Sequence, residues 1–193
     1  MLRKFPLFST LFRVRKAVIL GVLAATLMFT APVAERYGDR LQIVLPVLAL
    51  GCSVLTGSVG EYMVRLVGLE VVVHSTKLGL GERPINQRPD GGYKGFPSGH
   101  TAAASFGASA LVHECIGKSP FVKGVVILGA AFTGASRIEA DKHNIWQVLA
   151  GALTGWGIDR VLRQNTPMRK RLNARVGAIL ARRRAKNRTA SGQ

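Results

Sequence analysis

Two histidines, His100 and His143, stand in sequence contexts suited to proton transfer and nucleophilic attack. His100 closes the stretch Pro97-Ser98-Gly99-His100, in which Ser98 is a typical N-cap for a helix that begins there. The free N–H groups of a helix N-terminus bind anions, and an adjacent imidazole can transfer a proton to a bound anion. The stretch alone is more typical of an ordinary capped helix with an unrelated histidine, so its meaning depends on the rest of the chain.

Fixed cations accompany the two histidines. Arg83-Pro84 and Arg88-Pro89 follow Lys77 in one polar stretch, and Ser136-Arg137 shortly precedes His143. Arginine forks bind phosphate oxygens in pairs and stabilise the charge that develops during phosphoryl transfer. If one imidazole attacks phosphorus and the other protonates the leaving oxygen, the set predicts phosphoryl transfer through a covalent intermediate. The sequence shows no acidic cluster of the kind that holds magnesium or zinc, so we expect no metal and no cofactor.

The elements that must position these residues are apolar segments. They cover residues 17–34, 41–57, 61–76, 98–112, 124–136 and 145–162. The pattern predicts an all-α fold, a polytopic membrane helical bundle with six transmembrane helices. A cleaved signal peptide is the alternative for the first segment, but its length favours a retained span.

Several ionisable and thiol side chains fall within or beside these segments. Glu61 and Arg65 can pair at i,i+4, whereas Glu70 is a candidate buried carboxylate that is either functional or paired. Cys52 and Cys115 show no metal-ligand spacing. We interpret these two cysteines as small core residues and do not expect them to form a disulfide.

The composition suits a single membrane domain with basic ends. The 193 residues carry a net charge of +17 and a positive mean hydropathy, +0.22. We expect a basic cytoplasmic arm (1–16), the six-span domain (17–163) and a basic cytoplasmic tail (164–193). The tail predicts an amphipathic helix on anionic lipid, with a disordered anchor as the alternative. Its apolar stripe is Leu172, Val176, Ile179 and Leu180. Few aromatic residues accompany the charge, so nucleic acid is not an expected partner.

The distribution of lysine and arginine orients the predicted bundle. Six spans place both termini on one side, together with the loop that contains Lys118 and Lys123, and the positive-inside rule makes that side cytoplasmic. The polar loop 35–40, which carries no net charge, the loop 77–97 and the turn 137–144 then lie on the outer side. The latter two still contain cations that indicate an anionic substrate, namely Lys77, Arg83, Arg88, Lys94, Arg137 and Lys142.

The order Arg-Pro, then Pro-Ser-Gly-His, then Ser-Arg-x5-His resembles the type-2 phosphatidic acid phosphatase superfamily over residues 74–157. The resemblance implies a helical bundle with His143 as the nucleophile and His100 as the general acid. It also implies phosphate contacts from the Lys and Arg of the first cluster and from three later positions, namely Ser98, the Gly99 N–H and Arg137.

Two departures from the family pattern concern the site. The spacing from Lys77 to the first-motif arginine fits neither Arg83 nor Arg88, and we favour Arg88 because its context leads into the second motif. Gln147 stands where the family commonly has aspartate. Gln147 can fix the imidazole tautomer of His143 but supplies no charge, which leaves Asp141 as the nearest carboxylate.

The run from His74 to Lys77, followed by Gly81-Glu82-Arg83-Pro84, looks like bacterial lipid A phosphatases, in particular those that act at the 1-position. This resemblance implies a multi-pass protein of the bacterial inner membrane, with a periplasmic site, cytoplasmic termini and a phosphorylated lipid as substrate. Polyprenyl diphosphate, phosphatidylglycerol phosphate and phosphatidic acid remain alternative substrates, and a lipid phosphotransferase remains an alternative enzyme. A non-catalytic protein that binds or transports anionic lipid is the alternative of another class. The sequence does not indicate an oligomeric state.

Overall fold

The computed structural model describes residues 6–29 and 33–190, and it describes side chains for residues 14–29 and 33–183. Residues 1–5 of the predicted arm and 191–193 of the predicted tail lie outside the described residues. The elements are α1 (Pro6–Met28), α2 (Ala34–Leu55), α3 (Val59–Leu80), the short 3-10 helix η1 (Pro84–Asn86), α4 (Gly99–Glu114), α5 (Pro120–Glu139), α6 (Ile145–Val161) and α7 (Pro167–Ala190). The described ranges contain no strand, which confirms the all-α class. Among the described helices, α2 and α5 are long and apolar enough to cross a membrane, so six spans stay a prediction.

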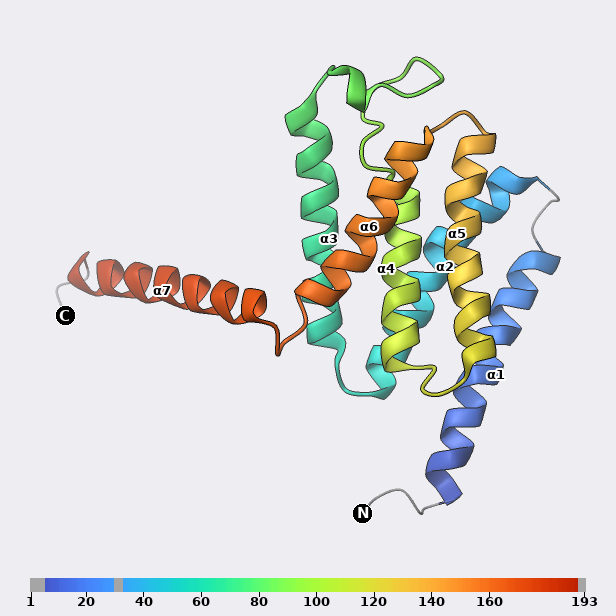
Figure 1. Cartoon of the computed structure of the whole chain (residues 1–193). Coiled ribbons are helices and arrows are strands. Elements are labelled where there is room, and N and C mark those ends of the chain that lie inside the picture. The colour runs from blue at the N-terminus through green and yellow to red at the C-terminus, as the bar shows by residue number, and fades with distance from the viewer. Residues whose placement is uncertain (1–5, 30–32, 191–193) are drawn as a thin grey trace. The chain divides into compact units, whose positions relative to one another are not determined.

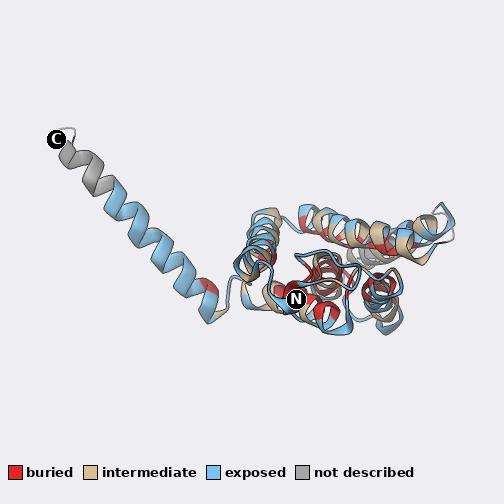
Figure 2. Cartoon of the chain, turned by 90° about the horizontal axis from the view of Figure 1, so that it is seen from above, coloured by how far each residue is buried: buried red, intermediate tan, exposed pale blue. Residues whose placement is uncertain are grey.

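Helix α4 forms the interior of a compact unit that ends at Arg160 (Figure 1). It packs on α2, α3 and α5, and its inward positions are mostly small residues such as Ala102, Ala104 and Ala110, none more than 1% exposed. Small side chains let helix backbones approach closely. A Cβ on Gly107 would overlap the backbone at Pro46, so glycine is required where α2 crosses α4. Figure 2 shows buried residues on the bundle helices that face this interior.

The stretch 35–40, expected to be a polar loop, is helical and forms the first turns of α2. An acidic residue in the first turn, Glu35, suits the positive end of the helix dipole. Gly38 packs so closely on Ser136 of α5 that a side chain there would overlap the serine hydroxyl. This close approach brings the beginning of α2 beside the end of α5, where Arg137 lies.

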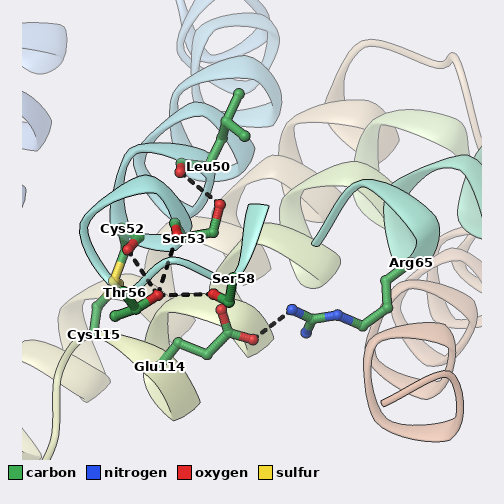
Figure 3. The surroundings of a disulfide bond; sticks show 8 residues. All are labelled: Leu50, Cys52, Ser53, Thr56, Ser58, Arg65, Glu114 and Cys115. Carbon is green, nitrogen blue, oxygen red and sulfur yellow. Dashed lines mark hydrogen bonds and ion pairs between the residues drawn. A yellow bond between two sulfur atoms is a disulfide. The ribbon is translucent and has the colours of Figure 1, made fainter. Parts of the chain in front are cut away.

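The cysteine prediction is wrong, because Cys52 and Cys115 are joined by a disulfide (Figure 3). Cys52 lies in α2 and Cys115 caps the C-terminus of α4, with 6.1 Å between their Cα atoms. That separation is within the usual range of about 4.4–6.8 Å for a disulfide. The contact between α2 and α4 brings the cysteines together, and their sequence separation of 63 gave no sign of the bond.

A buried ionic network connects α3, α4 and α6 near the same end of the bundle. The Arg65 side chain is fully buried and pairs with Asp159, with Glu114 at 2.5 Å and with Glu61 at 3.8 Å. Ser109 donates to Asp159 at 2.6 Å. The predicted pair of Glu61 and Arg65 is therefore confirmed as part of a larger network. Paired, hydrogen-bonded charges of this kind tie helices together at defined positions.

The prediction of Glu70 as a buried carboxylate is wrong. Its side chain is 53% exposed and lies 3.3 Å from Nδ1 of His74, one turn further along α3. The reason is the face that α3 turns inward, which carries Tyr62, Leu69 and Val73 and leaves Glu70 on the other side.

Residues from Val161 onward form a second compact unit. Its helix α7 covers Pro167–Ala190. The four residues of the predicted apolar stripe are each 40–54% exposed. Arg169 donates to the Asn173 side chain at 3.2 Å and to the Leu162 carbonyl oxygen at 3.4 Å, which stabilises the start of the helix. Membrane-surface binding by this helix stays a prediction.

Candidate active site

The N-terminus of α4 is capped as the sequence predicts. Ser98 has extended backbone geometry, and its Oγ accepts a hydrogen bond from the Thr101 N–H at 3.5 Å. The same hydroxyl lies 2.9 Å from the Thr101 hydroxyl and is fully buried. Ser98 therefore organises the helix end, and the N–H groups of the first turn remain available for an anion.

Lys77 lies beside this helix end. Its Nζ is 3.6 Å from the point where a Gly99 side chain would begin, so the glycine leaves the α4 N-terminus open toward the ammonium group. Asn86, which the sequence analysis missed, fixes the surrounding loop. Its buried amide donates to the carbonyls of Lys77 and Gly81, and its Oδ1 accepts from the Phe96 N–H at 3.0 Å.

The two candidate first-motif arginines occupy different environments. Arg88 is half-buried, its Nε has no hydrogen-bond partner among the described residues, and its charge acts on both Lys77 and His143. A tight turn holds it, with the Arg88 N–H donating to the Gly92 carbonyl at 2.7 Å. Arg83 is exposed, and no contact described for its side chain joins it to the cluster. The structure therefore brings Arg88 to the site and leaves Arg83 outside.

His143 is nearly fully buried just before the start of α6 and is held by Gln147. Its Nδ1 lies 3.1 Å from Oε1 of Gln147. The Gln147 amide nitrogen donates to the backbone carbonyls of Ile85, at 3.2 Å, and Gln87, at 2.7 Å. Asn144 adds a reciprocal bond at the helix start, because its side-chain oxygen accepts from the Gln147 N–H at 3.0 Å.

These contacts assign the tautomer of His143. Since the NH₂ group of Gln147 faces two carbonyls, its oxygen must be the atom that faces the imidazole. Nδ1 of His143 then carries the proton and donates it to that oxygen, which leaves Nε2 with a free lone pair. A histidine held this way is oriented for attack through Nε2.

The charge state of His143 suits a nucleophile. Burial lowers its pKa to about 4, and the positive charges of Arg88 and Lys77 act in the same direction, whereas the Gln147 hydrogen bond opposes the shift. The imidazole is therefore neutral at pH 7. Lys77, Arg88 and His100 thus all act electrostatically on His143.

His100 and Arg137 meet at a carboxylate that the sequence analysis missed. Oδ1 of Asp39 lies 3.2 Å from Nε2 of His100 and 2.5 Å from Nη1 of Arg137. Glu35, one turn earlier in α2, lies 3.0 Å from Nη2 of Arg137. The signal was the spacing of Glu35 and Asp39, which places both on one face only if the stretch is helical. Asp141, the carboxylate considered beforehand, has no described contact with His143.

The arrangement provides what phosphoryl transfer needs: a neutral imidazole, a second imidazole paired with a carboxylate, a helix N-terminus and three cations. Within the described part of the chain, no group of three or more His, Cys, Asp or Glu side chains is placed to hold a metal ion. A further ion pair joins the turn after α5 to the loop before α4. Lys142 lies 3.4 Å from Asp90, whose backbone hydrogen bond from Gly92 lowers the carboxyl pKa.

Comparison with known proteins finds similarity over the part of the chain that contains both histidines. Residues 61–171 match the PAP2 superfamily. A lipid A 4'-phosphatase of Helicobacter pylori is 36% identical over 142 residues, which cover 66% of this chain and 68% of the relative. A lipid A 1-phosphatase of Porphyromonas gingivalis is 43% identical over 70 residues, which cover 35% of this chain and 16% of that protein. No solved structure matches the chain.

Proposed function

Because this chain belongs to the PAP2 superfamily and is a phosphatase that acts on phosphate monoesters, we propose that it dephosphorylates lipid A through a phosphohistidine on His143. One observation carries the mechanism. Two imidazoles, each held by its own side-chain partner, share a cluster of three cations at a helix N-terminus. His143 would act as the nucleophile and His100 as the acid.

In the first step, Nε2 of His143 attacks phosphorus and the bond from phosphorus to the lipid oxygen breaks. His100 gives its proton to that oxygen, so the dephosphorylated lipid leaves as a neutral hydroxyl. Arg88, Arg137 and Lys77 bind the phosphate oxygens, and the N–H groups of Gly99 and His100 complete the site.

In the second step, water attacks the phosphorus of the phosphohistidine. The now neutral His100 accepts a proton from that water, and the bond from phosphorus to Nε2 breaks. Inorganic phosphate leaves, and both imidazoles return to their starting states. Burial and the Arg137 charge disfavour the proton-carrying form of His100, and Asp39 offsets part of this effect, since a carboxylate beside an imidazole favours its cation.

Two observations support lipid A as the substrate. Both curated relatives are named for lipid A, although one name gives the 4'-phosphate and the other the 1-phosphate. The cations of the site also lie at one end of a bundle with two helices of membrane-spanning length and hydropathy. We propose that the chain lies in a bacterial inner membrane with the site on the periplasmic side.

The test uses the purified protein in detergent with lipid A and measures inorganic phosphate. His143→Ala is expected to lower the rate by at least a factor of about one thousand, as the loss of a nucleophile does. His74→Ala is the matched control, because that histidine is 68% exposed. Mass spectrometry of the product distinguishes the 1-position from the 4'-position. Full activity in His143→Ala would contradict the mechanism. Transfer of phosphate to another lipid without phosphate release would identify a phosphotransferase.

A further inference from the structure

A laterally open apolar cavity lies between α4, α5 and α6, with a volume of about 670 Å³. Its floor is made of small residues, among them Ala108 and Ala130, each less than 10% exposed. Large apolar side chains on α5 and α6 form the mouth, with Ile127, Leu153 and Trp156 more than half exposed. We call this cavity the α5–α6 groove. A volume of this size is typical of a site for a small organic ligand.

One end of the groove adjoins the active site. Thr101, which lines the groove, bonds to the Ser98 hydroxyl that caps α4. Val148, another lining residue, directly follows Gln147 in α6. Thr101 and Val148, 2% and 7% exposed, separate this end of the groove from the phosphate-binding residues, so a lipid chain in the groove would pass these two side chains.

The length of the groove matches a lipid chain. Along α4 it runs from Thr101 to His113, which at a rise of 1.5 Å per residue is about 18 Å. The hydrocarbon of one leaflet is about 15 Å deep, half of a bilayer core of about 30 Å. At the far end, Nη1 of Arg160 lies 3.4 Å from Nδ1 of His113, and the guanidinium stacks on the Trp156 ring. The lining therefore becomes polar at this end of the groove.

We infer that the α5–α6 groove holds one acyl chain of the lipid whose phosphate is cleaved. This inference rests on the proposed function and assigns the part of the site that recognises the lipid rather than its phosphate. The lining is almost wholly apolar, which suits a hydrocarbon chain and not a sugar or a peptide backbone. The polar end at Arg160 and His113 sets the longest chain that fits.

The first test fills the groove and compares two substrates. Ala131→Phe and Ala152→Phe add bulk at lining positions that are not fully buried, so they need not disturb the core. Each is expected to raise KM for a long-chain lipid phosphate at least tenfold and to leave turnover of p-nitrophenyl phosphate unchanged. Ala24→Phe, at an exposed position of α1 outside the groove, is the control and should change neither. Unchanged KM for the long-chain substrate in both groove variants would overturn the inference, as would an equal loss on both substrates.

A second test does not depend on turnover. A lipid phosphate with a photoreactive diazirine at the end of one acyl chain is bound to the His143→Ala variant and irradiated. Labelled peptides from α5 and α6 near Ile127 and Trp156 are expected, and Ala152→Phe should reduce their labelling at least fivefold. Labelling spread evenly over α1, α2 and α3 would refute the groove even if the enzyme is active. If the wild-type protein releases no phosphate but the groove is labelled, the proposed reaction fails and the acyl-chain site stands.

Discussion

The Gln147 side chain both accepts and donates hydrogen bonds, and a carboxylate could fill only the first of these roles. Its oxygen accepts from His143, while its nitrogen binds the Ile85 and Gln87 carbonyls of the loop opposite. Aspartate or glutamate could accept from the imidazole, but neither has a donor for those carbonyls. The amide thus connects His143 to the loop that carries Arg88. Without a negative charge beside it, His143 keeps a low pKa.

The pH profile tests this difference. With its pKa at about 4, His143 is neutral above pH 5, so kcat/KM of the wild type should fall only as pH drops toward 4. Gln147→Glu places a negative charge beside the His143 imidazole and raises its pKa. The acid limb of the kcat/KM profile should therefore move to higher pH. The variant should also lose about 1–3 kcal/mol of stability, because two carbonyls in part-buried hydrogen bonds lose their donor. An acid limb at the same pH in both proteins would contradict this account.

The same lowered pKa predicts how stability varies with pH. Between the ordinary histidine value of 6.5 and about 4, the unfolded chain binds a proton at this position that the folded chain does not. The contribution of His143 to stability is therefore full above pH 6.5 and declines as pH falls through that range.

Asp39 contacts both His100 and Arg137, and we expect it to orient His100 and to favour its protonated form. Asp39→Asn keeps the shape but removes the charge that bridges His100 and Arg137. The kcat for lipid A should fall about tenfold, part of the 10²–10⁴-fold that general acid catalysis contributes. The basic limb of the profile should also move to lower pH. With p-nitrophenyl phosphate, whose leaving group needs no proton, kcat should stay near the wild-type value. An equal loss on both substrates would show that Asp39 is only structural.

At the scale of elements, α6 is fixed to α4 by two glycines, Gly151 and Gly155. A Cβ on Gly151 would lie 2.5 Å from the Ser98 carbonyl oxygen, and one on Gly155 would overlap the Ala102 carbonyl. The backbone bond from the Ser98 N–H to the Gln147 carbonyl, 2.9 Å, joins the same two helices at the site. The distance between His143 and the N-terminus of α4 therefore depends on this helix contact.

Two alanine substitutions, two residues apart, test the contact. Gly155→Ala should cost about 1–3 kcal/mol of stability by overpacking and should lower kcat. A Cβ on Gly157 would have no neighbouring atom within 4 Å. Gly157→Ala should therefore be neutral, or stabilising by up to about 1 kcal/mol, which is the propensity gain of alanine in a helix. Thermal unfolding and phosphate release of both variants give the comparison. Equal effects at the two positions would contradict the close-contact argument.

The sequence could predict features that depend on neighbouring residues, but not those that depend on contacts between helices. The apolar segments located the helices, and Ser98 predicted the start of α4, because these features depend on neighbouring residues. The beginning of α2 was missed because Glu35 and Asp39 are polar, although their partners lie on α4 and α5. The disulfide and the full Arg65 network likewise depend on contacts between helices far apart in sequence. The motif residues indicated the chemistry. The residues that hold the motif side chains in place could be identified only from the packed structure.

At the scale of the whole molecule, the two ends of the bundle differ in chemistry. One end has the cationic site, and the other has the Cys52–Cys115 disulfide beside the Arg65 network (Figure 3). The lysine and arginine count predicts that the disulfide end is cytoplasmic. Disulfides persist in oxidising compartments and are rare in the cytosol. The pair is nearly inaccessible, with Cys52 at 6% and Cys115 at 1% exposure, so burial protects it from reductants on either side.

Labelling of single cysteines decides the orientation. In a Cys52→Ser, Cys115→Ser background, Tyr93→Cys reports the active-site loop and Lys118→Cys reports the loop that follows the disulfide. A membrane-impermeant maleimide should label Tyr93→Cys in spheroplasts and Lys118→Cys only after lysis, with phosphatase activity confirming that each variant is folded. The reverse pattern would place the disulfide end in the oxidising compartment and the site in the cytosol. The expected pattern would show that burial alone preserves the disulfide on the cytoplasmic side, whereas the reverse pattern would contradict the lysine and arginine rule for this chain.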